Sequence, residues 1–275
     1  MVYVQNPDVL GDSMAALPSD IKAIFLDLDG TMYMGSNLID GAHDFLERCK
    51  NKGVATFFLS NNSSRSVDQY KAKLQGFGIH ATDDEILLST HDLIAWLQAN
   101  NVTETWAVAT KGMCEMLEAV GISTRSTAPQ YVVVGYDTEL SYEKISTASI
   151  HLHAGVPLVA SHPDMVCPSP DGGLPDTGAY LVMFEATTGV KPTHVCGKPN
   201  PGMILHKIEA LGLEPQQCVM VGDRLYTDIA MANRSGVHSV LVLTGEATMD
   251  DVASLEEGSE FLPQHILSSV DELLR

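Results

Sequence analysis

Short apolar runs alternate with helix-like segments along most of this sequence. The first run, Ile21 to Leu28 (IKAIFLDL), is bounded by Asp20 and Gly30, as expected for a strand buried on both faces of a parallel sheet. Similar runs predict strands at Val54–Leu59, Trp106–Thr110, Tyr131–Tyr136, Pro157–Ser161, Cys218–Val221 and Ser239–Leu243. Helices are predicted at Ile39–Lys50, Ser66–Gly76, Lys111–Val120, Ser141–Ala154, Ala179–Thr188, Pro201–Leu211 and Tyr226–Arg234. This alternation indicates an α/β fold in which helices cover both faces of a doubly wound parallel sheet.

One long segment interrupts the alternation, from Ser161 to Gly178 (SHPDMVCPSPDGGLPDTG), and it is rich in Pro, Gly and Asp. We predict a loop here, and loops of this length inside a compact domain are often functional. Asp164 and Cys167 offer a polar and a soft side chain in this loop, so they are candidate contacts for the variable part of a substrate.

The balance of charge limits the partners of the chain. It contains 16 Lys and Arg residues against 35 Asp and Glu residues, a net charge of -19 at pH 7. A surface this acidic repels nucleic acids and anionic membranes, so we expect neither as a partner. An anionic substrate would have to be drawn in by a local cation.

The cysteines and the N-terminus bear on the compartment. Five cysteines, with no pair at C-x-x-C spacing, suggest neither a disulfide framework nor a zinc site and favour reduced thiols in the cytoplasm. Met1 to Asp20 has no Lys or Arg and no long apolar run, so we expect a short polar extension rather than a signal peptide. No run of 18 apolar residues exists, so no membrane span is predicted.

Four polar clusters follow predicted strands or lie close to their ends. They are Asp27–Thr31 (DLDGT), Ser60–Asn62 (SNN), Gly197–Pro199 (GKP), and Gly222-Asp223 together with Asp228. In open parallel sheets, ligands bind beyond the carboxyl ends of the strands. We therefore expect these clusters to build one site.

The aspartates of these clusters call for a cation. Asp27, Asp29, Asp223 and Asp228 would carry four negative charges, and two such charges about 4 Å apart repel by roughly 4 kcal/mol at an effective dielectric near 20. Carboxylate and carbonyl oxygens with room for water suit Mg²⁺, so all four are candidate metal ligands. With Mg²⁺, the charge of Lys198 and a protonated Asp29, the cluster would be neutral and could accept a phosphate dianion.

Chemical roles follow from this arrangement. The Asp27 carboxylate can attack phosphorus and form an aspartyl-phosphate. Asp29, two residues on, can give a proton to the leaving alcohol and then take one from the attacking water. Asp223 would ligate the metal, and Asp228 would act directly, through water or from outside the coordination sphere.

The other two clusters supply candidate contacts for the phosphate. The Ser60 hydroxyl and nearby backbone N–H groups could hold the phosphoryl oxygens, and Asn61 and Asn62 are candidates for the same substrate contact. Lys198 would neutralise charge on the phosphate and on Asp27.

These four motifs, in this order, resemble those of the haloacid dehalogenase-like hydrolase superfamily. Further segments resemble its NagD or 4-nitrophenylphosphatase subfamily, and the likeness covers nearly the whole chain from Ile21 onward. They are SNNSSR at 60–65, GYD at 135–137, SYEK at 141–144, SHPD at 161–164, and KP with GKPNP at 191–201.

The resemblance implies a Rossmann-like catalytic core, 1–89 plus 191–275, with an inserted α/β cap domain at 90–190. It implies that the main-chain carbonyl of Asp29 also binds Mg²⁺. Members of this family often pair through their caps, so a homodimer is one expected assembly. Pyridoxal phosphate phosphatases of the subfamily carry a His where Cys167 stands, which argues against that substrate.

The sequence therefore predicts a Mg²⁺-dependent phosphomonoester hydrolase that acts on small phosphorylated metabolites, such as sugar phosphates or nucleotides, through an aspartyl-phosphate. Two alternatives remain open. One is a phosphotransferase or mutase with the same intermediate, and the other is a non-catalytic phosphate-sensing protein. The insertion of cap size and the acid at Asp29 favour turnover over sensing.

Overall fold

The first predicted strand is β1 (Ala23–Asp27), and all five of its residues are buried. This account rests on a computed structural model that describes residues 17–169 and 171–275. Most of the expected N-terminal extension therefore lies outside the described residues. The chain divides into two compact units. The first comprises the described part of Met1–Leu59, with Phe77–Ile79 and Ile204–Arg275; the second comprises Ser60–Gly76 and His80–Met203.

The sheet of the first unit contains five parallel strands in the order β14-β13-β12-β1-β4. Besides β1 these are β4 (Ala55–Ser60), β12 (Cys218–Gly222), β13 (His238–Val242) and β14 (His265–Leu267). In this register Leu26 pairs with Val221, so the carboxyl ends of β1 and β12 are adjacent. The register thus places Asp27 beside the Gly222-Asp223 step.

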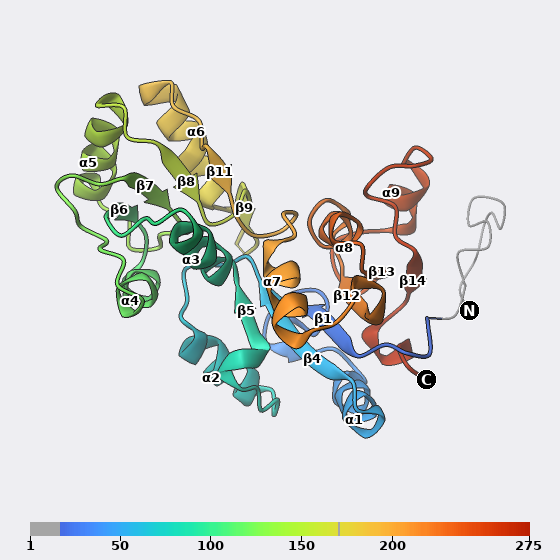
Figure 1. Cartoon of the computed structure of the whole chain (residues 1–275). Helices are drawn as coiled ribbons and strands as arrows, with labels where there is room; N and C mark the ends of the chain where they lie inside the picture. Colours follow the sequence, from blue (N-terminus) through green and yellow to red (C-terminus); the bar gives the residue numbers. More distant parts are fainter. Residues whose placement is uncertain (1–16, 170) are drawn as a thin grey trace. The chain divides into compact units, whose positions relative to one another are not determined.

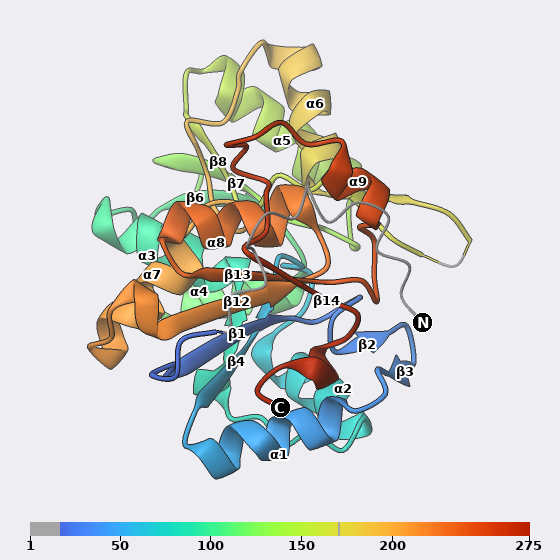
Figure 2. The same cartoon turned by 90° about the vertical axis from the view of Figure 1, so that its right-hand side faces the viewer.

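Helices lie on both faces of this sheet, which explains why its strands are mostly apolar. In Figure 1, α1 (Ala42–Lys52) lies on one face, and α7 (Gly202–Leu211) and α8 (Ala230–Ser235) lie on the other. Figure 2 shows β13, β12, β1 and β4 following one another between α8 and α1. Smaller elements complete the unit. They are the hairpin β2 (Tyr33–Met34) and β3 (Asn37–Leu38), the π-helical turn η3 (Leu225–Ile229), α9 (Met249–Ala253), and the 3-10 turns η2 (Pro215–Gln217) and η4 (Val270–Glu272).

The second unit has its own parallel sheet, in the order β11-β8-β7-β6. Its strands are β6 (Thr105–Val108), β7 (Tyr131–Val134), β8 (Leu158–Ala160) and β11 (His194–Val195). Neighbouring residues of β7 point to opposite faces, as the pleat requires. Val133 packs in one apolar cluster with α3 (Ser89–Ala99) and α4 (Lys111–Ala119), whereas Val132 and Val134 pack in another with α5 (Tyr142–His153) and α6 (Thr177–Thr188). The mixed α/β class with a parallel central sheet is confirmed.

Some elements of the second unit were not predicted. The expected loop at Ser161–Gly178 contains an antiparallel hairpin, β9 (Val166–Cys167) with β10 (Leu174–Pro175), whose strands are too short to show a periodic pattern. β5 (Ile86–Leu88) leads directly into α3, so its apolar run merges with that of the helix and neither stood out. The helix α2 (Val67–Gly76) was expected at Ser66–Gly76, whereas the 3-10 turn η1 (Asp83–Glu85) was not expected.

The compact units are cut at other points than the expected domains. The second unit holds 60–76, 80–89 and 191–203 in addition to the expected cap at 90–190, so the domain boundaries stay a prediction. Within the part of the chain that the structure describes, no helix combines the length and the apolar character that crossing a bilayer requires.

Candidate active site

Three aspartates from the first unit converge in a buried group. Asp27 ends β1, Asp223 follows β12, and Asp228 lies in the π-helical turn η3. They are 8%, 2% and 0% exposed, and one oxygen from each lies within 4.8 Å of the others. Three ionised carboxylates this close repel one another strongly unless a cation offsets their charge.

Backbone hydrogen bonds orient two of these carboxylates. Asp223 Oδ2 accepts the N–H of Glu246 at 2.7 Å, and Asp228 Oδ2 accepts the N–H of Arg224 at 3.1 Å. The Asp223 carbonyl also accepts the N–H of Ala247 at 3.0 Å. The loop after β13 is thereby tied to the end of β12, and the carboxylates are held rather than left to rotate.

Glycines allow the backbone to approach these carboxylates. A Cβ atom at Gly30 would lie 2.4 Å from Asp223 Oδ2, and one at Gly245 would lie 2.0 Å from the same oxygen. Gly30 also has φ +89°, a conformation that favours glycine. A Cβ at Gly222 would lie 2.2 Å from Cβ of Asp228. Any larger side chain at these positions would fill the space around the carboxylates.

These features fit a hard divalent cation. The donors are carboxylate oxygens, which Mg²⁺ prefers, and a cation of this kind keeps several water ligands. Within the described ranges, two buried hydroxyl oxygens of the first unit, Oγ1 of Thr31 and Oγ1 of Thr227, have no hydrogen-bond partner. Buried hydroxyls of this kind are normally satisfied, so they are suited to bind water or a ligand oxygen.

Asp29 differs from the three buried aspartates because it is exposed. It lies two residues after Asp27, where a bridge joins it to Tyr33 and the N–H of Gly30 donates to the Tyr33 carbonyl at 2.8 Å. Thr244 Oγ1 donates to the Gly30 carbonyl at 2.6 Å and holds this turn. An exposed carboxyl on a braced turn can exchange protons with solvent, as an acid and base must.

Arg224 is a cation that the sequence analysis did not assign. Burial lowers the pKa of its guanidinium, but the Glu246 carboxylate, 3.0 Å from Nε, outweighs this together with Tyr226, Asp27 and Asp223. The net pKa lies above the usual range of arginine. Arg224 therefore stays charged and offsets part of the negative charge of the aspartates. Its position within the segment GDRLYTD, between Asp223 and Asp228, is the sequence feature that could have indicated this role.

In the second unit, the Ser60–Asn62 segment is ordered by its own side chains. Ser60 Oγ lies 2.8 Å from Tyr70 Oη and accepts the N–H of Asn62 at 3.2 Å. Asn62 Oδ1 accepts from the N–H and the hydroxyl of Ser64, at 2.9 and 2.6 Å. These local bonds fix the turn after β4.

Asn61 connects three parts of the second unit. Its Oδ1 accepts the N–H of Lys198 at 2.7 Å, and its Nδ2 donates to the Lys198 carbonyl at 2.9 Å. The same Nδ2 lies 3.2 Å from a carboxylate oxygen of Asp164. Gly197 has φ +69° and would place a Cβ 2.7 Å from Asn61 Oδ1. The structure thus brings Asn61, Asp164 and Lys198 together.

Two further residues bear on this group. Asp92, which the sequence analysis missed, accepts the N–H of Gly197 at 2.8 Å and so helps to hold the turn before Lys198. The sequence feature that could have indicated this role is a carboxylate among the apolar residues on the buried face of α3. Cys167 lies near Tyr136. The pKa of Tyr136 is raised mainly by burial and, second, by a hydrogen bond with Cys167. The two loop residues singled out from the sequence therefore face different surroundings.

A second group that could hold a metal consists of His162, Asp164 and Asp176, whose ligand atoms lie within 4.8 Å of one another. In the structure His162 Nε2 and Asp176 Oδ1 are 2.9 Å apart, at hydrogen-bond distance. We therefore treat these residues as part of a hydrogen-bonded network.

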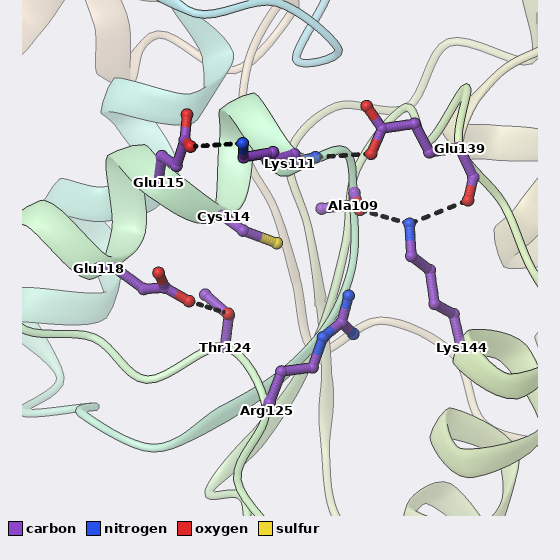
Figure 3. A pocket seen from close by; sticks show the side chains of 9 residues that line it. All are labelled: Ala109, Lys111, Cys114, Glu115, Glu118, Thr124, Arg125, Glu139 and Lys144. Carbon is purple, nitrogen blue, oxygen red and sulfur yellow. Dashed lines mark hydrogen bonds and ion pairs between the residues drawn. The ribbon is translucent and has the colours of Figure 1, made fainter.

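A pocket of about 280 Å³ lies beside α4 (Figure 3). Its charged side chains are engaged with the protein: Lys111 pairs with Glu115 at 3.5 Å, and Lys144 Nζ lies 2.8 Å from Asp137. Arg125 donates to the Ala107 carbonyl at 2.7 Å. Because these cations already have partners, we assign no ligand to this pocket.

Comparison with known proteins identifies the family. The family model of the haloacid dehalogenase-like hydrolases matches residues 24–123, and a second model of HAD-hydrolase-like proteins matches 195–273. An acid sugar phosphatase of Staphylococcus aureus is 33% identical over 84% of this chain and 90% of its own.

Solved structures of similar proteins support the same family. The 4-nitrophenylphosphatase of Thermotoga maritima superposes with a TM-score of 0.88 at 35% identity, over 93% of this chain and 97% of its own. NagD of E. coli K-12 superposes with a TM-score of 0.83 at 26% identity, over 92% and 98%. The chain belongs to the haloacid dehalogenase-like hydrolase family, in the branch of NagD and the 4-nitrophenylphosphatases, and is a hydrolase of phosphoric monoesters.

Proposed function

We propose that this phosphatase hydrolyses small phosphorylated metabolites with Mg²⁺, through an aspartyl-phosphate on Asp27. The observation that carries the proposal is the buried group of Asp27, Asp223 and Asp228, whose oxygens lie within 4.8 Å of one another. Asp27, Asp223 and the Asp29 carbonyl would hold the ion, with Asp228 binding directly or through water. When bound, Mg²⁺ would offset the charge of the carboxylates and of the phosphoryl oxygens.

The aspartates would perform the chemistry in two steps. The Asp27 carboxylate attacks phosphorus while the bond to the leaving oxygen breaks, and Asp29 gives that oxygen its proton. Asp29, now ionised, takes a proton from water, which attacks the phosphorus of the aspartyl-phosphate and restores Asp27. The contrast in exposure supports these roles, because Asp27 is buried and Asp29 is exposed.

The remaining residues would bind the substrate. We propose that Lys198 pairs with the phosphate, that Ser60, Asn61 and Asn62 shape the loop that contacts it, and that Asp164 and Cys167 contact the leaving group. The support for Lys198 is its environment. The residue is 4% exposed, and both its backbone N–H and its carbonyl are hydrogen-bonded to the side chain of Asn61. In a chain with a net charge of -19, a held cation is what an anionic substrate requires.

For the substrate we favour sugar phosphates, because a relative that is 33% identical over most of this chain is named an acid sugar phosphatase. A homodimer through the cap and a cytoplasmic location stay predictions. Nucleotides are the second class to test.

Phosphate release tests the function. The protein should release phosphate from 4-nitrophenyl phosphate and from a panel of sugar phosphates when Mg²⁺ is present. A rapid quench should trap phosphate on Asp27. Adding a second alcohol separates hydrolysis from transfer: a phosphorylated alcohol as the main product would favour a phosphotransferase. Stable binding of phosphate without turnover would favour a sensor.

A further inference from the structure

A fully buried chain of polar side chains runs through the second unit, from Ser63 to Asp176. Ser63 Oγ accepts the N–H of Tyr136 at 2.8 Å and the hydroxyl of Ser161 at 3.0 Å. Ser161 Oγ lies 2.8 Å from His162 Nδ1, and His162 Nε2 lies 2.9 Å from Asp176 Oδ1. Ser63, Ser161 and His162 are 0% exposed, and Asp176 is 4% exposed.

The donors of this chain determine where its protons are. A serine hydroxyl has one proton, and Ser161 uses it on Ser63. The contact between Ser161 and His162 must then be donated by Nδ1–H of His162. A carboxylate can only accept, and Asp176 Oδ1 already accepts the N–H of Thr177. Oδ1 of Asp176 thus meets both Nε2 of His162 and the N–H of Thr177, and His162 and Asp176 form a buried hydrogen-bonded pair.

This pair fixes the loop that carries Asp164. The N–H of Gly178 donates to the Asp164 carbonyl at 2.7 Å, and the N–H of Asp176 donates to the Met165 carbonyl at 3.1 Å. A Cβ at Gly178 would lie 2.4 Å from the Pro163 carbonyl oxygen, so the loop packs directly on the start of α6. With the pair of His162 and Asp176, the segment 162–165 is held at several points against the N-terminus of this helix.

From this loop the contacts continue to the proposed phosphate-binding lysine. The Asp164 carboxylate accepts from Nδ2 of Asn61, and Asn61 holds the N–H and the carbonyl of Lys198. All these residues belong to the second unit. A displacement of the loop would therefore be transmitted to the backbone of Lys198.

We propose that His162 and Asp176 are positioning residues of this phosphatase: their buried pair sets Asp164, and through Asn61 the backbone of Lys198, for substrate binding. The inference rests on the proposed role of Lys198. Because the pair acts on binding and contacts no reacting atom, its loss should raise KM and leave kcat nearly unchanged. A rise of about 10-fold is expected, within the range for side chains that share one network.

A double-mutant cycle tests this, with kcat and KM measured on glucose 6-phosphate and Mg²⁺. His162→Leu should raise KM about 10-fold in the parent and have no further effect in Asp164→Ala, because Asp164 transmits the change. Asp176→Asn is the conservative variant. Its Oδ1 can still accept from Thr177 and from Nε2–H of His162, and the Ser161 hydroxyl can turn to donate to Nδ1, so KM should stay within about 2-fold of the parent.

Lys144→Met is the matched control, since Lys144 forms another ion pair in the same unit, 2.8 Å from the buried Asp137. It should not couple to Asp164→Ala. Additive effects of His162→Leu and Asp164→Ala, or a fall in kcat alone, would overturn the proposal.

Hydrogen exchange provides a measurement that does not depend on activity. The N–H of Lys198 donates to Asn61, so peptides that contain Lys198 should exchange faster in His162→Leu and in Asp164→Ala than in the parent or Lys144→Met. Unchanged exchange would overturn the inference even if the enzyme is active. If the two variants exchange faster than the parent but the parent has no phosphatase activity, the proposed function is refuted and the positioning network stands.

Discussion

Replacing Asp228 by Asn should stabilise the protein in the absence of metal while weakening its use of Mg²⁺. Asp228 is completely buried and shares the site with Asp27 and Asp223, with oxygens within 4.8 Å. At an effective dielectric near 20, two unit charges at this separation repel by about 3 kcal/mol. The substitution keeps the shape of the side chain and removes two of the three repulsive pairs.

Two effects make the gain in stability smaller than the full repulsion energy. The N–H of Arg224 donates to Asp228 Oδ2, and a hydrogen bond to a charged group is worth roughly 1 kcal/mol more than one to a neutral amide. The charge of Arg224 already offsets part of the repulsion among the aspartates. We therefore expect a net gain of about 2 kcal/mol in the free energy of unfolding, which in a chain of this size raises Tm by roughly 4–8 °C.

The assay is thermal unfolding, followed by circular dichroism in chelator and in excess Mg²⁺. In chelator the variant should melt above the parent. In Mg²⁺ the difference should shrink or reverse, because the parent gains more from binding the ion. Asp20→Asn, which removes an exposed aspartate, should melt with the parent in both buffers. A variant that melts at or below the parent in chelator would refute the view that these carboxylates repel one another in the folded protein.

Three further predictions concern catalysis. Asp27→Asn should abolish both turnover and the trapped phosphoenzyme, and near-normal rates in this variant would exclude the covalent mechanism. Asp29→Asn should slow turnover by about 10²–10⁴-fold, with the largest effect for substrates that have poor leaving groups. Chelation should abolish phosphate release and Mg²⁺ should restore it, with Ca²⁺ restoring little because it favours looser coordination; full activity in excess chelator would contradict the metal assignment. Asp164→Ala and Cys167→His should change the ranking of kcat/KM across a substrate panel by about 1–3 kcal/mol, and a uniform change for all substrates would place specificity elsewhere.

Much of the fold could be predicted because its strands are buried on both faces. The runs Ile21–Leu28 and Cys218–Val221 became β1 and β12, since a strand covered by helices on both sides is apolar along most of its length instead of at alternate positions. The aspartates after these strands could be singled out for the same reason: polar residues directly after a buried parallel strand lie at the edge where ligands bind.

Elements at the limits of these patterns could not be predicted. The helix expected at Tyr226–Arg234 begins as a π-helical turn over Leu225–Ile229, and hydrophobic periodicity does not distinguish the extra residue of such a turn. The hairpin in the loop at Ser161–Gly178 consists of two-residue strands, which are too short for alternation to be visible.

The sequence alone determined the α/β class and the family, and it singled out the candidate aspartates, because apolar runs and ordered motifs are local in the chain. Only the tertiary structure decided which side chains meet. The pair of His162 and Asp176 forms because a hairpin returns the chain to the start of α6, and Asn61 meets Lys198 across 137 positions because β11 lies in the same unit as the turn after β4. Such pairings depend on the path of the backbone through space, which no spacing in the sequence records.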